Sequence, residues 1–411
     1  MAAVSPGSCP DALRLLRRRP AAVALAVAVA LALALAAALA GPGGLPTTPH
    51  FTRPATTPLG GSLPVRYVVG RPPGPPVQAQ AAILMEVSTG TILYAKNEHQ
   101  RRAPASTTKI VTALLALESG RLNDRVRVSR RAASVTGSSA DLAAGEVLTL
   151  EELLYGLMLP SGNDAAVAIA EHLAGSEAEF AAWMTRRARE LGAYESRFEN
   201  PHGLDSPGHY TSAYDLAILA RTAMQFPTFA RIVGQKAYTD LAGRRTWHNT
   251  NRLLWSFEGA TGIKTGTTGR AGHCLVAAAN REGMQVLAVV LGSSDRWGDA
   301  ARLLEYGLSA FALVELARRG DEVARLPLGA GAAELQVVAG QRLALVVPVR
   351  RVKDVRGVVA LQRVRPPLRA GQAVGRLTGY LADEPFGWVP LVAGREVSRP
   401  PWWRWWGSGR R

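Results

Sequence analysis

The apolar positions between residues 78 and 317 follow two different periods. Residues 81–86 and 91–95 are apolar runs on either side of a Ser-Thr-Gly turn, and this pattern predicts two short paired strands. Residues 273–279 and 285–291 form a second pair of apolar runs, and the tight connection between them predicts an antiparallel hairpin. The centre of the chain is therefore expected to contain an antiparallel sheet.

Segments with helical periodicity lie between these strands. The predicted helices cover residues 110–118, 150–159, 165–173, 178–191, 213–233 and 300–318. Residues 125–129 alternate and predict one further strand, and residues 161–164 form a predicted loop after Pro160. Helices mixed with antiparallel strands indicate an α+β domain, which we place at residues 78–317.

The pattern changes after residue 318. Short strands separated by turns are predicted at 334–338, 342–349, 357–361, 373–377 and 387–392. They indicate a small all-β domain over residues 318–395. Residues 396–411 form a tail in which two pairs of tryptophans flank an arginine, a composition that favours a membrane interface.

The N-terminal region has two parts. Residues 21–40 contain only Ala, Val and Leu and follow several arginines, so residues 1–41 are predicted to be a secretory signal or an uncleaved membrane anchor. Residues 42–77 are rich in proline and glycine and are predicted to be a linker. We therefore expect an exported protein at the extracytoplasmic face of the cell membrane.

The charge and the cysteines narrow the choice of partners. The formal net charge is +16, which favours an anionic partner, but an export signal argues against nucleic acid. Cys9 and Cys274 lie on opposite sides of the apolar segment, so no disulfide is expected and Cys274 is predicted to be a buried apolar residue. No cluster of histidine and cysteine has metal-ligand spacing, so neither a metal nor a cofactor is expected.

The first candidate for chemistry is the pair Ser106 and Lys109. Three residues apart at the start of a helix, they share one face, where a neutral lysine amine could take the proton of the serine hydroxyl. The free N–H groups of a helix start would also stabilise an oxyanion. Taken alone, Ser106 could equally be a helix cap. Two further motifs follow in order, Ser161-Gly162-Asn163 and Lys264-Thr265-Gly266.

The order Ser-x-x-Lys, Ser-x-Asn and Lys-Thr-Gly is that of the penicillin-binding proteins and class A β-lactamases. Residues 104–118, 159–163, 200–204 and 262–269 together resemble the serine-type D-Ala-D-Ala carboxypeptidases of low molecular mass. The likeness covers residues 78–315, and residues 367–375 resemble the β-rich C-terminal domain of that family. It implies a penicillin-binding-protein/β-lactamase-like domain followed by a small all-β domain.

The resemblance also implies roles for the motif residues. Ser106 would attack the D-Ala-D-Ala carbonyl, Lys109 would act as base, and Ser161 would pass the proton to the leaving D-alanine. Asn163, Lys264, Thr265, Gly266, Thr267 and Arg296 would bind the substrate. Lys264 would also help to keep Lys109 neutral, and the N–H groups of Ser106 and Thr267 would form the oxyanion hole. Arg296 could alternatively be a surface arginine in a loop.

The implied substrate is a peptidoglycan pentapeptide that ends in D-Ala-D-Ala, with β-lactam antibiotics as inhibitors. A β-lactamase is one alternative, because Glu199 could activate a deacylating water. Its setting in Phe198–Leu204, however, resembles the carboxypeptidases. A DD-endopeptidase would use the same three motifs, and a non-catalytic cell-wall or membrane binder would have lost some of them. His202 is interpreted as a structural turn residue.

Overall fold

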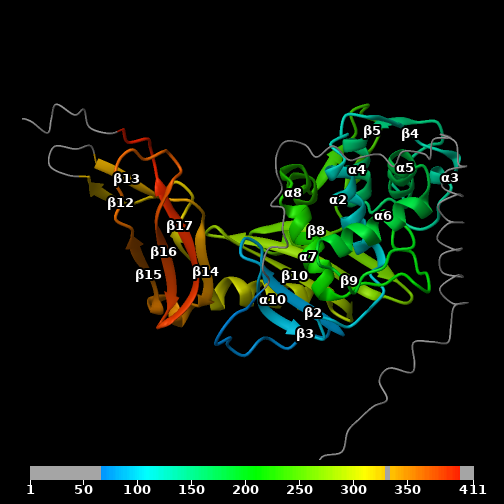
Figure 1. The fold of residues 1–411 in the computed structure, drawn as a ribbon. Helices are drawn as coiled ribbons and strands as arrows, with labels where there is room; N and C mark the ends of the chain where they lie inside the picture. The colour runs from blue at the N-terminus through cyan, green and yellow to red at the C-terminus, as the bar shows by residue number, and fades with distance from the viewer. Residues whose placement is uncertain (1–65, 329–333, 399–411) are drawn as a thin grey trace, which may run out of the picture. The chain divides into compact units, whose positions relative to one another are not determined.

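The computed structural model describes residues 66–328 and 334–398. A six-stranded sheet in the order β1-β3-β2-β10-β9-β8 forms the centre of the part that contains residues 66–310 (Figure 1). Its strands are β1 (Arg66–Tyr67), β2 (Ala81–Glu86), β3 (Thr91–Lys96), β8 (Ala260–Thr268), β9 (Gly272–Arg281) and β10 (Met284–Ser293). All neighbours are antiparallel except β1, which runs parallel to β3. The predicted sheet is confirmed, with one parallel edge strand added.

The strand β1 lies inside the segment predicted as a linker. Arg66 pairs with Thr91 and Tyr67 with Ile92, and Val77 is also buried. The expectation that the folded chain begins near residue 78 is therefore wrong. Residues 66–69 read Arg-Tyr-Val-Val, a β-prone run that the surrounding proline and glycine concealed.

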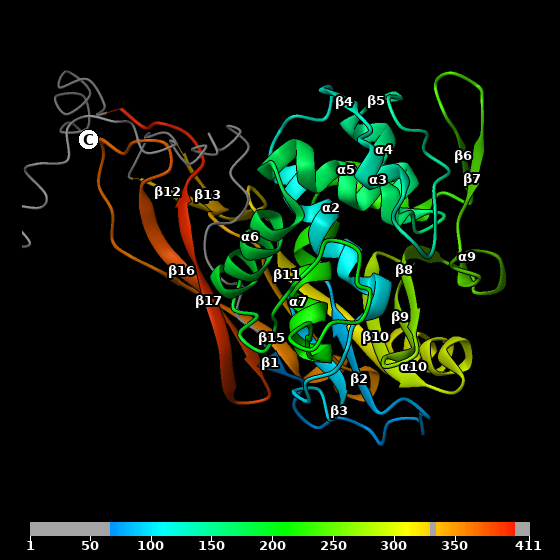
Figure 2. The ribbon, with the colours of Figure 1, turned by 90° about the vertical axis from the view of Figure 1, so that its right-hand side faces the viewer.

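The described helices cover both faces of this sheet. They are α2 (Lys109–Glu118), α3 (Arg130–Ala133), α4 (Leu150–Met158), α5 (Asn163–Ala174), α6 (Glu177–Glu190), α7 (Ala213–Met224), α8 (Pro227–Gly234), α9 (Leu253–Ser256) and α10 (Arg296–Ala310), with the 3₁₀ turn η1 at Ala105–Thr108. Short hairpins pair β4 (Arg125–Arg127) with β5 (Val147–Thr149), and β6 (Ala237–Thr239) with β7 (Thr246–His248). Figure 2 shows the group formed by α2, α4, α5 and α6.

Successive residues of one strand enter different cores. Ile83 and Met85 belong to the cluster built around α2, whereas Ala82 and Leu84 belong to the cluster that contains Leu303 of α10. This division follows from the two-residue period of a strand, which points alternate side chains to opposite faces. Because both faces are buried, the central strands are continuously apolar and do not alternate with polar residues.

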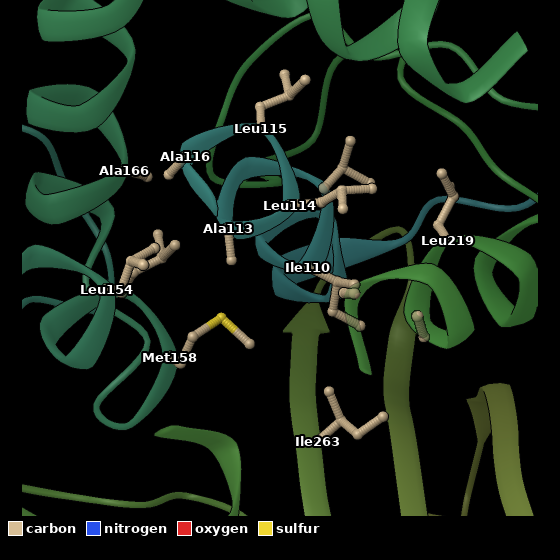
Figure 3. Packing of buried hydrophobic residues seen from close by; sticks show 14 of the residues in the cluster. Ile110, Ala113, Leu114, Leu115, Ala116, Leu154, Met158, Ala166, Leu219 and Ile263 are labelled. Carbon is tan, nitrogen blue, oxygen red and sulfur yellow. The ribbon is translucent and has the colours of Figure 1, made fainter. Parts of the chain in front are cut away.

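The helix α2 is the most deeply buried part of the helical layer. Every residue from Lys109 to Leu117 is buried. Figure 3 shows Ile110 and Leu114 of α2 among side chains of α4, α7 and β8, including Met158 and Ile263. A helix that is covered on all sides holds its first residue, Lys109, rigidly, and it also fixes the adjoining turn η1, which carries Ser106.

Two predicted helices differ in the structure. Residues 213–233 form two helices, because Pro227 opens α8 and its ring cannot continue the α7 helix. The helix predicted at 300–318 ends at Ala310, and Phe311–Ala317 is the strand β11. β11 pairs with β14 (Leu343–Pro348), so long-range pairing decides the structure of this segment.

The C-terminal part is all-β, as predicted. β12 (Glu322–Pro327), β13 (Glu334–Ala339), β15 (Val355–Leu361), β16 (Ala373–Leu381) and β17 (Glu384–Ala393) form a sheet in the order β12-β13-β17-β16-β15, and the 3₁₀ turn η2 (Val349–Asp354) precedes β15. The sheet has its own core of residues such as Val337 and Leu391. The strand β12 was not predicted.

Several predicted segments fall outside the described residues. These are the signal or anchor at 1–41, the linker up to residue 65, and the Trp-rich tail from residue 399 onward. Within residues 66–328 and 334–398, no helix combines the length and the apolar character that a bilayer crossing requires.

Candidate active site

Ser106 lies in the 3₁₀ turn η1, which leads directly into α2. Its side chain is half-buried, and Lys109 is the first residue of α2. The Lys109 Nζ atom lies 3.0 Å from Ser106 Oγ. Neither η1 nor α2 has a side-chain cap, so Ser106 is not the helix cap considered above. The predicted nucleophile and base are in contact.

Lys109 sits in a site that favours a neutral amine. Its Nζ also lies 2.7 Å from Asn163 Oδ1 and 2.9 Å from the His202 carbonyl oxygen. Burial, followed by the charge of Lys264, lowers the pKa of Lys109 well below 10.5, and Asp164 opposes this shift. A neutral amine that donates its two N–H bonds to Asn163 and His202 turns its lone pair toward the Ser106 hydroxyl.

Asn163 and Asp164 open α5 and connect it to the segment 136–142. Asn163 Nδ2 donates to the Thr136 carbonyl at 2.6 Å, so the amide oxygen is left to accept from Lys109. The Asp164 carboxylate accepts from Ser139 Oγ and from backbone N–H groups of that segment. The loop is shorter than the predicted 161–164, because Asn163 and Asp164 already belong to α5.

Ser161 lies between α4 and α5 with a positive φ of 71°. Its hydroxyl is buried and has no hydrogen-bond partner among the described residues. Because buried hydroxyls are almost always satisfied, this one is available to a group that enters the site. Asn163, two residues later, connects the motif to Lys109.

The Asn-Pro-His-Gly turn supports Lys109 from a further side. Asn200 accepts from Gly203 N at 2.7 Å and donates to the Leu204 carbonyl at 3.0 Å, which fixes the turn. A Cβ on Gly203 would lie 1.9 Å from the Ala105 carbonyl oxygen, so only glycine allows this approach. The sequence predicts a structural role for His202, but it gives no sign that the His202 carbonyl accepts a hydrogen bond from Lys109.

The third motif lies on β8, beside the predicted nucleophile Ser106. A Cβ on Gly266 would lie 3.0 Å from Ser106 N, so this glycine lets the strand approach the nucleophilic turn. Lys264 is buried, and burial followed by the charge of Arg296 lowers its pKa to about 7. Thr265 Oγ1 lies 2.7 Å from Thr250 Oγ1, a contact that no motif indicated.

Arg296 begins α10 and reaches back to β8. Its Nη1 donates to the Gly266 carbonyl at 3.0 Å and to Thr267 Oγ1 at 2.8 Å. The side chain is half-buried, and it has no carboxylate partner within the described part of the chain. The structure thus brings Arg296 to the end of the Lys-Thr-Gly strand and does not leave it as a surface arginine.

Two residues near the site have other roles. His209 Nε2 lies 2.9 Å from Thr108 Oγ1, and burial lowers the pKa of His209 to about 4, so the ring is neutral behind the nucleophilic turn. The Glu199 carboxylate accepts from Ser206 Oγ and Gly208 N. Among the described residues, Glu199 makes no hydrogen bond to Ser106, so its role is to hold its own loop.

Cys274 is buried, as predicted, and burial raises the pKa of its thiol to about 11. Over residues 66–328 and 334–398, no three His, Cys, Asp or Glu side chains gather as a metal site would need. What the site contains is a serine hydroxyl in contact with a buried lysine amine, with the basic side chains of Lys264 and Arg296 nearby.

This fold and site define a serine acyl-transfer enzyme of the penicillin-binding type. The family model for D-alanyl-D-alanine carboxypeptidase matches residues 69–295, and that for the penicillin-binding protein 5 C-terminal domain matches residues 311–399. The chain therefore belongs to the D-alanyl-D-alanine carboxypeptidase family of low-molecular-mass penicillin-binding proteins, and it is a serine DD-carboxypeptidase.

Individual relatives agree with this assignment. D-alanyl-D-alanine carboxypeptidase DacF of Bacillus subtilis is 36% identical over 338 residues, which cover 78% of this chain and 86% of the relative. Penicillin-binding protein 5 of Haemophilus influenzae has a TM-score of 0.67 at 29% identity, with 80% of this chain and 100% of that chain covered. For penicillin-binding protein 6B of Escherichia coli the TM-score is 0.65 at 32% identity, with 79% and 98% covered.

Proposed function

We propose that Ser106 is the nucleophile and Lys109 the base of this carboxypeptidase. The observation that carries the proposal is the contact of 3.0 Å between Lys109 Nζ and Ser106 Oγ, in a site that lowers the lysine pKa. Because the two other Nζ contacts are to oxygen acceptors, the amine is oriented toward the hydroxyl.

The reaction proceeds by acyl transfer. Ser106 Oγ bonds to the carbonyl carbon of the penultimate D-alanine while Lys109 takes the hydroxyl proton. The C–N bond to the terminal D-alanine then breaks, and the proton reaches its nitrogen through the buried Ser161 hydroxyl. Water afterwards attacks the ester and restores Ser106. The N–H groups of Ser106 and Thr267 stabilise the oxyanion in both steps.

The substrate-binding residues divide into two groups. Asn163 hydrogen-bonds the amide of the substrate and holds Lys109. Lys264, Thr265, Gly266, Thr267 and Arg296 bind the terminal carboxylate and align the peptide along β8. A guanidinium is suited to the carboxylate, since it offers two parallel N–H donors, and in the described part of the chain the Arg296 hydrogen bonds come from Nη1 alone.

We further propose that the substrate is a peptidoglycan stem peptide ending in D-Ala-D-Ala and that the enzyme works at the outer face of the cell membrane. The apolar run at 21–40 and the Trp-rich tail at 396–411 support this location. Deleting residues 1–40 should keep the protein inside the cell, where protease added to intact spheroplasts cannot reach it. Digestion of this variant by the added protease would contradict export by that segment.

The proposed roles are tested by the intact mass of the full chain after mixing with benzylpenicillin. The expected result is a persistent gain of one drug molecule that disappears in Ser106→Ala. Ser309→Ala is the matched control, because Ser309 lies on α10 and, among residues 66–328 and 334–398, its hydroxyl bonds only to the Glu305 carbonyl. An adduct that remains in Ser106→Ala would refute the assignment of the nucleophile, and rapid drug hydrolysis would indicate a β-lactamase.

A further inference from the structure

A pocket lies beyond the end of the Lys-Thr-Gly strand. It is lined by Arg252, His273, Ser294, Asp295, Arg296 and Trp297. Two of these residues connect it to the proposed carboxylate site, because Arg296 donates to Thr267 Oγ1 and His273 Nδ1 lies 3.3 Å from the same atom. The pocket therefore adjoins the position of the substrate's terminal residue, which is the leaving group of acylation.

Two arginines share one indole ring in this pocket. The Arg296 guanidinium carbon lies 4.8 Å from the centroid of the Trp297 ring, and that of Arg252 lies 6.0 Å from it. Contact with an aromatic face holds a guanidinium in place without using its N–H donors. Both groups can therefore still bind an anion.

The positive charge of the pocket is not neutralised from within. Among the described residues, neither Arg252 nor Arg296 forms an ion pair with a carboxylate. Asp295 is the acidic residue of the lining, and its carboxylate accepts from Gly298 N at 3.0 Å and lies 3.4 Å from Arg302. Arg252 and Arg296 thus both line the side of the site where the leaving residue lies. One cation is enough to bind a single terminal carboxylate, so the second is left for another anionic group.

We propose that Arg252 is a specificity-determining residue that binds a second carboxylate on the leaving residue of the substrate. The inference rests on the proposed placement of the terminal carboxylate at Arg296 and Thr267. It extends the substrate class from a terminal D-alanine to D-residues whose side chains carry an acidic group.

The test uses three synthetic peptides, N-acyl-L-Lys-D-Ala-D-X with X as Ala, Glu or Gln, and the full chain. Release of free D-X gives kcat/KM for each peptide. D-Gln has nearly the shape of D-Glu without its charge, so the ratio of D-Glu to D-Gln isolates recognition of the second carboxylate. We expect the wild type to favour D-Glu about tenfold, which corresponds to about 1.4 kcal/mol, and raised salt should reduce this preference.

Arg252→Gln should bring the D-Glu to D-Gln ratio close to one, and Arg252→Lys should keep part of the preference. The ratio is taken within each variant, so a general loss of activity cancels. Arg319→Gln is the matched control, because this exposed arginine follows β11 and lies outside the pocket lining. It should leave the ratio unchanged.

The outcomes separate the two proposals. In the first outcome, the wild type releases D-alanine from the first peptide but releases D-Glu and D-Gln at equal rates. In the second, the preference for D-Glu survives in Arg252→Gln. Either outcome would overturn only the inference about Arg252 and would leave the proposed function standing. Failure of the wild type to release D-alanine from the first peptide would instead contradict the proposed function.

Discussion

Asp164 directly follows the Ser-Gly-Asn motif, and its carboxylate accepts hydrogen bonds that the motif alone does not predict. Its carboxylate accepts from Ser139 Oγ at 2.7 Å, from Ala140 N at 2.9 Å and from Leu142 N at 3.1 Å. It also accepts from Ala165 N at 2.8 Å. These bonds fasten the segment before α4 to the start of α5, where Asn163 contacts Lys109.

The change Asp164→Asn replaces one accepting oxygen with an NH₂ group that cannot accept. At least one of the N–H donors then loses its acceptor in a buried site, and the remaining bonds lose the assistance of the negative charge. Each bond to a charged group contributes about 1.5–3 kcal/mol, so we expect the free energy of unfolding to fall by about 3–5 kcal/mol. A loss of this size is large against a total of about 5–15 kcal/mol.

Urea unfolding followed by tryptophan fluorescence measures this effect. Of the nine tryptophans, Trp247 touches the affected segment, since among the described residues its Nε1 donates to the Ala140 carbonyl at 2.9 Å. Asp141→Asn is the matched control, because Asp141 is exposed, its side chain has no hydrogen bond among the described residues, and asparagine tolerates its positive φ. The control should unfold like the wild type.

Acylation by benzylpenicillin should also slow in Asp164→Asn, since Asn163 is anchored to the same segment through Thr136. Unfolding free energies within about 1 kcal/mol of the wild type would refute the reasoning, because a carboxylate with three buried backbone donors cannot be replaced at so little cost.

Two further changes test the surroundings of Ser106 and Lys109. Gly203→Ala should lower the unfolding free energy by about 2–4 kcal/mol and slow acylation, because its Cβ would meet the Ala105 carbonyl. Gly243→Ala, also at positive φ but in open space, should lose only about 1 kcal/mol, and equal losses in the two variants would contradict the argument. His209 has a folded pKa of about 4 against an ordinary 6.5, so protonation of the unfolded chain removes stability as the pH falls through this interval. The stability difference between the wild type and His209→Gln should therefore narrow by on the order of 2 kcal/mol from pH 7 to pH 4, and parallel stability curves would show that His209 does not titrate in this way.

Much of the site could be predicted because its chemistry is local in sequence. Ser106 and Lys109 are one helical turn apart, and the Lys-Thr-Gly strand carries its own apolar pattern. Arg296 is farther along the chain, but it was placed by resemblance and does contact Thr267. The residues that bind substrate remain predictions, since no ligand contact tests them.

What escaped prediction depends on long-range contacts. The His202 carbonyl binds Lys109 across 93 positions of sequence, and a backbone oxygen leaves no mark in residue identity. Thr250, which precedes α9, meets Thr265 of β8 only because the chain between them turns back on itself. The strand β11 has an apolar pattern that fits a helix as well as a strand, and its partner β14 decides between them.

The central claim is that Ser106 is activated by a Lys109 amine that burial and Lys264 keep neutral. The most direct test is the rate constant of acylation by saturating benzylpenicillin as a function of pH. The lowered pKa of Lys109 predicts a rate that rises with pH and reaches a plateau well below pH 10.5, the ordinary value for a lysine. A rate that continues to rise tenfold per pH unit up to that value would show an ordinary charged lysine, and the account of the base would be wrong.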